Sequence, residues 1–483
     1  MAQQLFFSRD TKVYIKFGTK VWDLPVLDGF SFSQATNSSE ITLAEMEGSG
    51  GASRRGRKQF NDSLAPAEWS FSTYVRPFKA ASGSAAGTAD AAALTHAVEE
   101  VLWAMFLGGK SYADDHQLFQ DTAPVEVAQA SLVEGTSYVI KTVGSTNWTA
   151  IGAADAVIGT AFVRNAAAVS GTGGAAEQVL NVPAATSSKF NADLSNKATL
   201  GTADIFFVLG DANRKVYKLK DCVVNEASLD FDIDGIATIS WSGMSSEIID
   251  MTTKTHTGAV PVAFDDDRDG GTVNVEVGDV VLATGDSHRL SVITVVPGSG
   301  NCTLTGGIYE STLATDNFIR NRLTQLTVVP TAGTSYIGSL QAGGYDITLT
   351  GGNITMSNNI TFITPEEIGL VNVPIGHVTG TRSVSGSMNC YLSKDTAAVN
   401  NSADLWEDLK GITSVVTNSF ALDFKIGGTT ASTPRLQVSM PTCHLEIPTH
   451  SIEDVISVET AFNALPSTID GTNEATITYF SKQ

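Results

Sequence analysis

The feature that most constrains the fold of this chain is an internal repeat. Five short motifs from the first half recur in the same order in the second half. Motifs that recur in a fixed order indicate a duplicated structural unit, so we predict two copies of one module. The matched pairs are Phe7-Ser-Arg9 with Phe318-Ile-Arg320 (followed by Ile15 and Phe17, or by Leu326 and Val328), Gly29–Ser33 with Gly352–Met356, Ser70–Val75 with Ser385–Leu392, Leu102-Trp103 with Leu405-Trp406, and Cys222 and the segment from Ile236 with Cys443 and the segment from Val455.

Within the module, the hydrophobic pattern is that of β-strands. Lys12–Phe17 and Trp69–Val75 alternate apolar and polar side chains, which gives a strand one buried face and one exposed face. Lys215–Val224 and Ile236–Ser242 follow, and Asp234-Gly235 between them predicts a hairpin turn because both positions tolerate positive φ. The predicted fold class is therefore mainly β, with two copies of a β-sandwich or barrel-forming module.

Each module is predicted to contain one helix. In the first copy an apolar stripe extends from about residue 90 to residue 107, and Gly108-Gly109 ends it. In the second copy Ala403–Leu409 is a shorter helical segment. The stripe consists of Ala91, Leu94, Val98, Val101, Leu102 and Met105.

Two segments interrupt the repeated modules. Residues 128–185 are rich in Ala, Gly, Thr and Ser, and the module continues on both sides of them. We interpret this segment as a small β-rich domain inserted at a surface loop, where insertions are tolerated. The predicted organisation is 1–120 plus 196–255 for the first module, 121–195 for the inserted domain, 256–315 for a β-rich connector or small domain, and 316–483 for the second module.

Composition and charge exclude several classes of protein. Apolar residues make up 42% of the 483 residues, which is enough for a core and excludes global disorder. The 30 Lys and Arg residues against 51 Asp and Glu residues give a net charge of −21, which repels polyanions and argues against ordinary DNA binding. The 4 scattered cysteines predict buried free thiols. Because no run of eighteen apolar residues and no secretory leader is found, we expect a soluble protein without a membrane partner.

These features together resemble the tail tube, or major tail, proteins of long non-contractile-tailed phages, in the version where the tube module is duplicated. The resemblance rests on the opening Phe-x-Arg segment, the long loop Thr36–Ala67, the strand pair around a lone helix, the closing hairpin and the Ala/Gly/Thr-rich insert. It covers about two thirds of the chain, and the connector has no family counterpart. It implies a structural protein of the virion, without enzymatic activity or a cofactor.

The resemblance also implies an assembly. In that family, six modules form a ring whose inner sheets make a continuous barrel, and rings stack through the long loop and the chain ends. A duplicated subunit then implies a homotrimer with pseudo-sixfold symmetry. The implied partners are further copies of the chain, a tape measure protein, and tail tip and terminator proteins. DNA would pass through the lumen during ejection without specific binding, in a tail assembled in the host cytoplasm.

A DNA conduit should repel the phosphates that pass through it, because each neutralised phosphate would act as a brake. Acidic side chains on strands whose other face is apolar are therefore candidates for the lumen. For any one of them, a solvated surface position is the alternative. The candidates are Asp230, Asp232, Asp234, Glu446, Glu453 and Asp454.

One basic cluster, Arg54, Arg55, Arg57 and Lys58, lies inside the long loop. Since the guanidinium group pairs in a bidentate manner with carboxylates, we predict that on an acidic particle this cluster contacts the neighbouring ring. Phosphate binding and an ordinary solvated loop are the alternatives. The matching stretch of the second copy, residues 365–382, is not basic, so two ring contacts would use different chemistry.

A calcium-loop pattern occurs in the connector. Asp265, Asp267, Asp269 and Glu276 have the spacing of the ligands of a calcium loop, with Gly270 at the sharp turn. The flanking segments are extended instead of helical, so an acidic turn is preferred and a structural calcium site is the alternative. We therefore expect no cofactor, with calcium as the exception to test.

The alternative function is that of a β-rich binding module, such as a virion decoration protein or a glycan-binding adhesin. Trp148 in the inserted domain is the aromatic residue to test for surface binding. Enzymatic readings have less support, because the 7 histidines are dispersed and no nucleophile-elbow motif occurs. A tube subunit should form trimers or polymers of constant width without a ligand.

Overall fold

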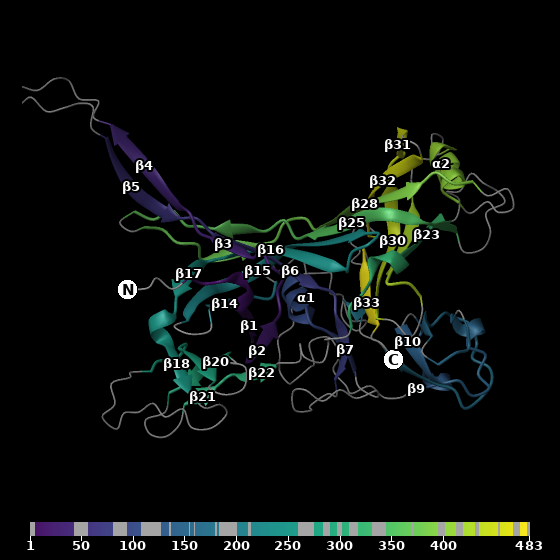
Figure 1. The fold of residues 1–483 in the computed structure, drawn as a ribbon, viewed down its shortest axis with the longest axis horizontal. Helices are drawn as coiled ribbons and strands as arrows, with labels where there is room; N and C mark the ends of the chain where they lie inside the picture. The colour runs from purple at the N-terminus through teal and green to yellow at the C-terminus, as the bar shows by residue number, and fades with distance from the viewer. Residues whose placement is uncertain are drawn as a thin grey trace, which may run out of the picture.

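The structure is a computed structural model of the chain. It describes residues 5–42, 57–80, 94–107, 127–134, 137–153, 155–158, 160–178, 181–182, 200–210, 214–258, 275–283, 290–296, 302–308, 317–330, 344–368, 371–394, 401–411, 419–429, 434–452, 455–466 and 474–480. These residues are mainly β, which confirms the predicted fold class, and they include two α-helices (Figure 1).

Most strands fall into two sets. The first set is β1 (Lys12–Phe17), β2 (Lys20–Leu24), β3 (Ser31–Ser33), β6 (Ala67–Tyr74), β14 (Ala203–Leu209), β15 (Lys215–Asp232), β16 (Thr238–Ser245) and β17 (Glu247–Asp250). The second set is β23 (Gln325–Pro330), β24 (Tyr345–Ile347), β25 (Leu349–Ser357), β28 (Ser383–Tyr391), β29 (Phe420–Ile426), β30 (Arg435–Leu445), β31 (Thr449–Ile452), β32 (Ile456–Ala464) and β33 (Thr476–Phe480).

The two sets share one pattern of antiparallel pairing. In the first set β2 pairs with β1, β1 with β14, β14 with β15, β15 with β16 and β17, β16 with β6, and β6 with β3. In the second set β24 pairs with β23, β23 with β29, β29 with β30, β30 with β32 and β33, β32 with β28, and β28 with β25. The shared pattern assigns each residue of one set an equivalent in the other.

A β-bulge occurs at the same place in both sets. The register between β14 and β15 shifts next to the Ala203–Cys222 pair, and the register between β29 and β30 shifts next to the Phe420–Cys443 pair. Both thiols are buried. Because a bulge bends its strand, β15 and β30 can each take part in two sheets. Each set therefore folds into two layers, with the side chains between them forming a core.

The two sets are joined edge to edge. The C-terminal half of β15, from Glu226 to Asp232, pairs with residues Gly351 to Ser357 of β25. The result is a continuous sheet of eight strands in the order β3, β6, β16, β15, β25, β28, β32, β31, which we call the long sheet. Figure 1 shows it extending across the molecule, with α1 (Glu100–Leu107) on one side of it.

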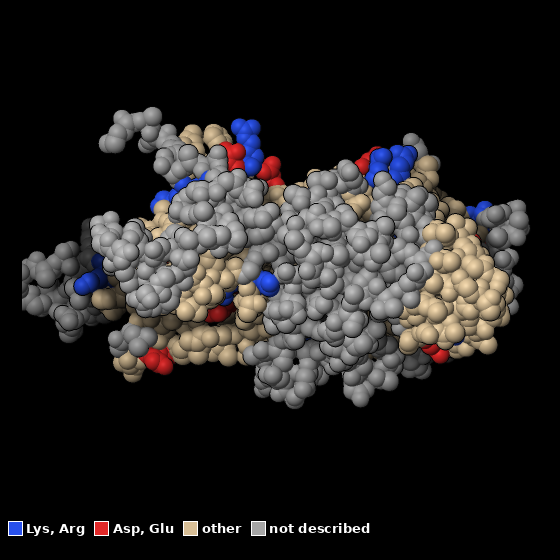
Figure 2. All heavy atoms as spheres, turned by 90° about the horizontal axis from the view of Figure 1, so that it is seen from below, with Lys and Arg blue, Asp and Glu red and all other residues tan. Residues whose placement is uncertain are grey.

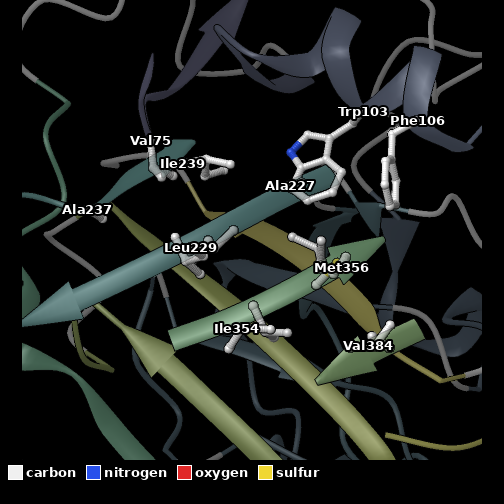
Figure 3. Close-up of a cluster of buried hydrophobic side chains, with 14 of the residues drawn as sticks. Val75, Trp103, Phe106, Ala227, Leu229, Ala237, Ile239, Ile354, Met356 and Val384 are labelled. Carbon is white, nitrogen blue, oxygen red and sulfur yellow. The ribbon is translucent and has the colours of Figure 1, made fainter. Parts of the chain in front are cut away.

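One core lies under the long sheet and is shared by both sets. Leu229 of β15 and Ile354 and Met356 of β25 cluster near Trp103 of α1 (Figure 3). All four side chains are buried. The joint between the sets is therefore packed like a protein interior and not like a contact between independent domains.

The first helix is shorter than the sequence analysis predicts. It begins at Glu100, whereas Leu94–Ala97 forms strand β8, which pairs with β7 (Pro77–Ala80). Residues 90–93 lie outside the described residues. The prediction was wrong because a short apolar segment fits both periodicities, and cross-strand pairing decides between them. The second helix, α2 (Ser402–Gly411), includes the predicted segment.

The predicted long loop contains a two-stranded arm instead of irregular chain. β4 (Thr36–Thr42) and β5 (Arg57–Leu64) pair antiparallel and project from the long sheet (Figure 1). In the second set, β26 (Thr361–Ile363) and β27 (Gly376–Val378) form a shorter hairpin at the same place in the order. The two hairpins touch, since the amide of Leu64 donates to the carbonyl of Asn372 at 2.8 Å.

Two small sheets complete the fold. The inserted segment forms β9 (Val127–Ala128), β10 (Ser137–Thr142), β11 (Ala161–Val163) and β12 (Ala175–Gln178) around its own core, and β13 (Asn181–Val182) pairs with β33. The connector forms β18 (Thr255–Gly258), β19 (Val280–Ala283), β20 (Leu290–Val295) and β21 (Thr303–Leu304), and β22 (Gly306–Ile308) pairs with β2.

The connector packs against the first set because only that set offers an apolar outer face. Phe206 and Val216 are buried against the connector, for example against Leu290. The equivalent residues of the second set are Asp423 and Gln437, whose side chains hydrogen-bond to each other at 2.8 Å. A polar face can stay exposed to solvent. The sequence difference between the outer faces of the two sets therefore decides that the connector packs on the first set.

Candidate assembly surfaces

The face of the long sheet that points away from α1 is polar. Side chains alternate along a strand, so the residues between the buried ones all lie on this face. In Figure 1 both small sheets lie on the same side as α1, opposite the polar face. Hydroxyl groups form bonds across this face, linking Ser31 with Ser70 at 2.8 Å, Ser72 with Ser240 at 3.0 Å, and Ser228 with Thr355 at 3.1 Å.

The polar face carries acidic residues and no basic ones. The strand segments that form the long sheet, counting β15 from Glu226, contain no Lys or Arg. Glu68, Glu226 and Glu459 were not among the predicted lumen residues, although their alternation with apolar neighbours is visible in the sequence. The acidic residues on the face are Glu68, Glu226, Asp230, Asp232 and Glu459.

The predicted lumen residues fall in different places. Asp230 and Asp232 lie on the polar face of β15. Asp234 lies in the following turn, where its carboxylate accepts a bond from Arg322 Nη1 at 3.0 Å. Glu446 is exposed directly after β30. Glu453 and Asp454 lie outside the described residues.

The long sheet ends in two strands that each have one unpaired edge within the described residues. β3 pairs with β6 alone, and β31 pairs with β32 alone. By the shared pairing pattern, β3 is equivalent to β25, and Thr449–Ile452 is equivalent to residues 228–231 of β15. The chain thus presents at its two ends the same two edges that it joins in its middle.

Each end also presents half of an apolar contact that is complete at the internal joint. Phe231 is 4% exposed, and its ring lies 5.5 Å from the ring of Phe424 across the joint. Its equivalent, Ile452, is 80% exposed. The equivalent of Phe424 is Phe207, which is buried in its own chain, and its ring lies 4.7 Å from the ring of the partly exposed Phe32 on the β3 edge. The two halves lie at opposite ends of one chain.

The described half of the basic cluster is engaged within the arm. Arg57 Nη1 pairs with the Glu40 carboxylate at 3.3 Å, and the Lys58 ammonium lies 5.1 Å from the centre of the Phe60 ring. Arg54 and Arg55 lie outside the described residues. The shorter hairpin has a different surface, because it exposes apolar side chains instead of charges. These are Ile363, Ile368, Val371, Val373 and Ile375.

The calcium-loop pattern falls mostly outside the described residues, since Asp265, Asp267 and Asp269 are not among them. Glu276 is exposed, and its carboxylate accepts a bond from Lys254 at 3.0 Å. This bond raises the pKa of Lys254. Within the part of the chain that the structure describes, no cluster of three or more His, Cys, Asp or Glu side chains has the arrangement of a metal site.

The hypothesis that Trp148 is a surface aromatic residue of the inserted domain is wrong. Trp148 is buried in the core of the inserted domain, and its indole N–H donates to the Val143 carbonyl at 2.8 Å. A buried indole cannot stack on a sugar, so the glycan-binding reading loses its main residue. Figure 2 views the side of the small sheets and shows a wide area with few charged side chains over the inserted domain.

A buried polar cluster ties the first helix to the last strand. Glu99, just before α1, accepts a bond from the Tyr479 hydroxyl of β33 at 2.8 Å, and the Trp103 indole donates to the same hydroxyl at 2.7 Å. Burial raises the pKa of Glu99 to about 7, although the Tyr479 bond and the nearby Arg76 charge act in the opposite direction. The cluster therefore holds a carboxyl group that changes charge near neutral pH.

The chain is similar to tail tube protein pb6 of Escherichia phage T5, with 25% identity over 483 residues, which covers 98% of this chain and 75% of pb6. No protein-family model matches the chain. In the described residues, no helix has both the length and the apolar character needed to cross a membrane. The near-complete coverage of this chain and its mainly β fold both support a phage tail tube protein, a structural component of the virion tail.

Proposed function

We propose that the subunit consists of two copies of one tube module and that three subunits close into a ring of six modules. The observation that carries this proposal is the pairing of β15 with β25, whose equivalents β31 and β3 both have an unpaired edge among the strands that the structure describes. Unpaired edges promote uncontrolled association, and a closed ring removes them. Repeating the internal joint between chains gives a ring of identical contacts.

The internal joint also gives the register of the proposed contact between subunits. Transfer of the β15–β25 pairing places Thr449 of one subunit opposite Ser33 of the next, and Ser451 opposite Ser31. Ile452 then points toward the Phe207 cluster of the neighbour, in the position that Phe231 occupies within the chain. The joint between subunits would therefore bury apolar side chains as well as pair two strands.

In this ring the polar face lines the lumen. The small sheets lie on the other side of the long sheet, where they do not obstruct a central channel (Figure 1). DNA carries about one charge per 1.7 Å of its axis, so any cation on the wall would retain it. A wall of hydroxyl groups with acidic residues and no Lys or Arg in its strands lets DNA pass during ejection without specific binding.

The two hairpins would join successive rings. The arm contributes a basic cluster and the shorter hairpin contributes exposed apolar residues, so the two modules would contact the next ring through different chemistry. A tape measure protein within the tube and tip and terminator proteins at its ends complete the proposed set of partners. No step of this function needs a cofactor or a catalytic group.

Electron microscopy of the purified full chain tests the proposal. We expect rods of constant width with an open bore, and ring views with threefold symmetry that approximates sixfold symmetry. A protein that remains monomeric at all concentrations, or that forms irregular aggregates without a bore, would contradict the proposal.

The charge of the lumen can be tested separately. Ser240 and Asp230 lie on the polar face, so Ser240→Lys combined with Asp230→Lys should make assembled tubes retain a short DNA duplex. Retention should fall steeply with added salt, because bound DNA releases counterions. Glu134→Lys combined with Val157→Lys, at two exposed positions of the inserted domain, adds the same charge and is the matched control. Equal retention by both variants would show that the polar face does not line the channel.

A further inference from the structure

The internal joint has a second layer of contacts beside the paired strands. The segment that precedes β23 lies against the turn between β15 and β16. The amide of Ala237 donates to the Ile319 carbonyl at 2.9 Å, and the amide of Asn321 donates to the Gly235 carbonyl at 3.1 Å. Ile236 and Arg320 form an antiparallel bridge. The segment thus adds a short strand-like clamp across the joint.

Side chains reinforce this clamp. Ile319 is completely buried. The Phe318 ring meets Tyr74 edge to face at 5.3 Å between centroids, and Arg322 pairs with Asp234 at 3.0 Å. Edge-to-face aromatic pairs add about 0.5–1.5 kcal/mol beyond the area that they bury. The clamp therefore contributes apolar, aromatic and charged contacts to one joint.

The N-terminal segment of the chain has the same local structure as the clamp. Ser8–Asp10 and Asn321–Leu323 are both single 3₁₀ turns that follow an extended residue, and in each the next Thr amide bonds to the first carbonyl of the turn. Each turn is followed, one residue later, by the first strand of its set. Phe6 is therefore equivalent to Ile319, and Phe7 is equivalent to Arg320.

Within the described part of its own chain, the N-terminal segment covers no such joint. Phe6 is 41% exposed, whereas Ile319 is 0% exposed. Leu5 and Phe7 are exposed as well. At the other end of the long sheet, the turn between β31 and β32 exposes Ile452 and Val455. Val455 is the equivalent of Ile236, as shown by the matching bonds from Val75 to Ala237 and from Leu392 to Ile456.

We infer that the N-terminal segment of each subunit docks on the turn between β31 and β32 of a second copy of this chain and clamps the joint between the two subunits. The inference rests on the proposed ring and goes beyond it, because strand pairing alone would leave this segment unbound. Phe6 takes the buried place of Ile319, and Phe7 lies opposite Val455 as Arg320 lies opposite Ile236.

A cross-linking experiment on assembled full-length protein tests the clamp. Residues that face each other in an antiparallel bridge have Cα atoms about 4.5–5.5 Å apart, within the range of a disulfide. The double variant Phe7→Cys with Val455→Cys should therefore form a disulfide between subunits on mild oxidation. Because one clamp lies at each joint of a closed ring, the covalent ladder on a non-reducing gel should end at three chains. The four native cysteines are buried and do not compete.

Three other results of this experiment would contradict either the clamp or the proposed function. Rods that form without any cross-link would overturn the clamp, and so would a ladder that continues beyond three chains, because it would place the N-terminus between rings. Failure of the unsubstituted chain to form rods would overturn the proposed function itself.

A second variant tests the same clamp by its energetics. Phe6→Asp should leave the subunit folded, since Phe6 is already partly exposed, and should lower the assembled fraction at least tenfold. Val157→Asp, an exposed apolar position of the inserted domain, should assemble as the unsubstituted chain does. If Phe6→Asp assembles normally, the N-terminal segment is not part of the joint.

Discussion

Ile452→Asp is expected to abolish ring formation while leaving the subunit folded. In the isolated chain Ile452 is 80% exposed, so the substitution should change the free energy of unfolding by no more than about 0.5 kcal/mol. In the ring the same side chain would take the buried place of Phe231 against the neighbour's Phe207 cluster. Burying an unpaired carboxylate there would cost about 3 kcal/mol or more at each joint.

Sedimentation velocity measures this effect directly, with the protein at a concentration where the unsubstituted chain is assembled. The variant should sediment as a single chain and show the same circular dichroism as the unsubstituted protein. Ile158→Asp, at an exposed apolar position of the inserted domain, is the matched control and should assemble normally. Normal assembly of Ile452→Asp would exclude β31 as the edge that joins subunits.

Glu99→Gln is expected to make the protein more stable above neutral pH and to remove part of the pH dependence of unfolding. The pKa of Glu99 rises from its ordinary 4.5 to about 7 because the carboxyl group is buried. Between these values the folded state holds a proton that the unfolded state has released. The free energy of unfolding must therefore fall as pH rises from about 4.5 to 7, and it stays low above 7.

The size of this effect follows from the size of the shift. One pKa unit corresponds to about 1.4 kcal/mol, so the shift of Glu99 corresponds to about 3 kcal/mol as an upper value. Glutamine stays neutral and keeps an oxygen that accepts the Tyr479 hydroxyl bond. Urea unfolding of the two proteins at pH 4.5 and pH 8 should thus show a difference that appears at the higher pH alone.

Glu68→Gln is the control for this measurement, because Glu68 lies exposed on the polar face of β6. It should change the pH dependence of unfolding little. If Glu99→Gln and the unsubstituted protein lose stability in parallel between pH 4.5 and 8, the buried carboxyl group is not the source of the pH dependence. Glu99 connects α1 to β33, so the same titration would affect the contact between the two sets of strands.

The proposed trimer would have modules that are equivalent in the lumen and different on the outside. The connector covers the outer face of the first set, where Phe206 is buried, while Asp423 occupies the equivalent place in the second set. The pseudo-sixfold symmetry would therefore hold for the long sheet and break to threefold symmetry at the surface. A duplicated chain permits this difference, because each copy can diverge on one face and keep the other.

The sequence by itself determined the mainly β fold and the positions of several strands. Strand alternation is a local property, so segments such as Lys12–Phe17 and Trp69–Val75 show it without knowledge of their partners. The acidic alternation of Asp230 and Asp232 is local in the same sense, and the structure places both on the polar face. The order of the repeated motifs was also visible in the sequence.

The register between the repeats was decided by tertiary structure alone. The sequence match places Phe7 with Phe318, whereas the two 3₁₀ turns make Phe7 equivalent to Arg320. A slip of two residues keeps every side chain on the same face, so hydrophobic pattern cannot detect it. The match of Gly29 with Gly352 is off by one residue, because strand pairing makes Phe32 equivalent to Ile354.

Burial of individual side chains also required the tertiary structure. Trp148 was predicted to be a surface aromatic residue, and no sequence pattern distinguished Glu99, but both side chains are buried. The joint between β15 and β25 connects residues more than a hundred positions apart. Local pattern fixes which face of a strand is apolar, but the chain as a whole decides which edges meet, because edge pairing depends on backbone groups that every strand has in common.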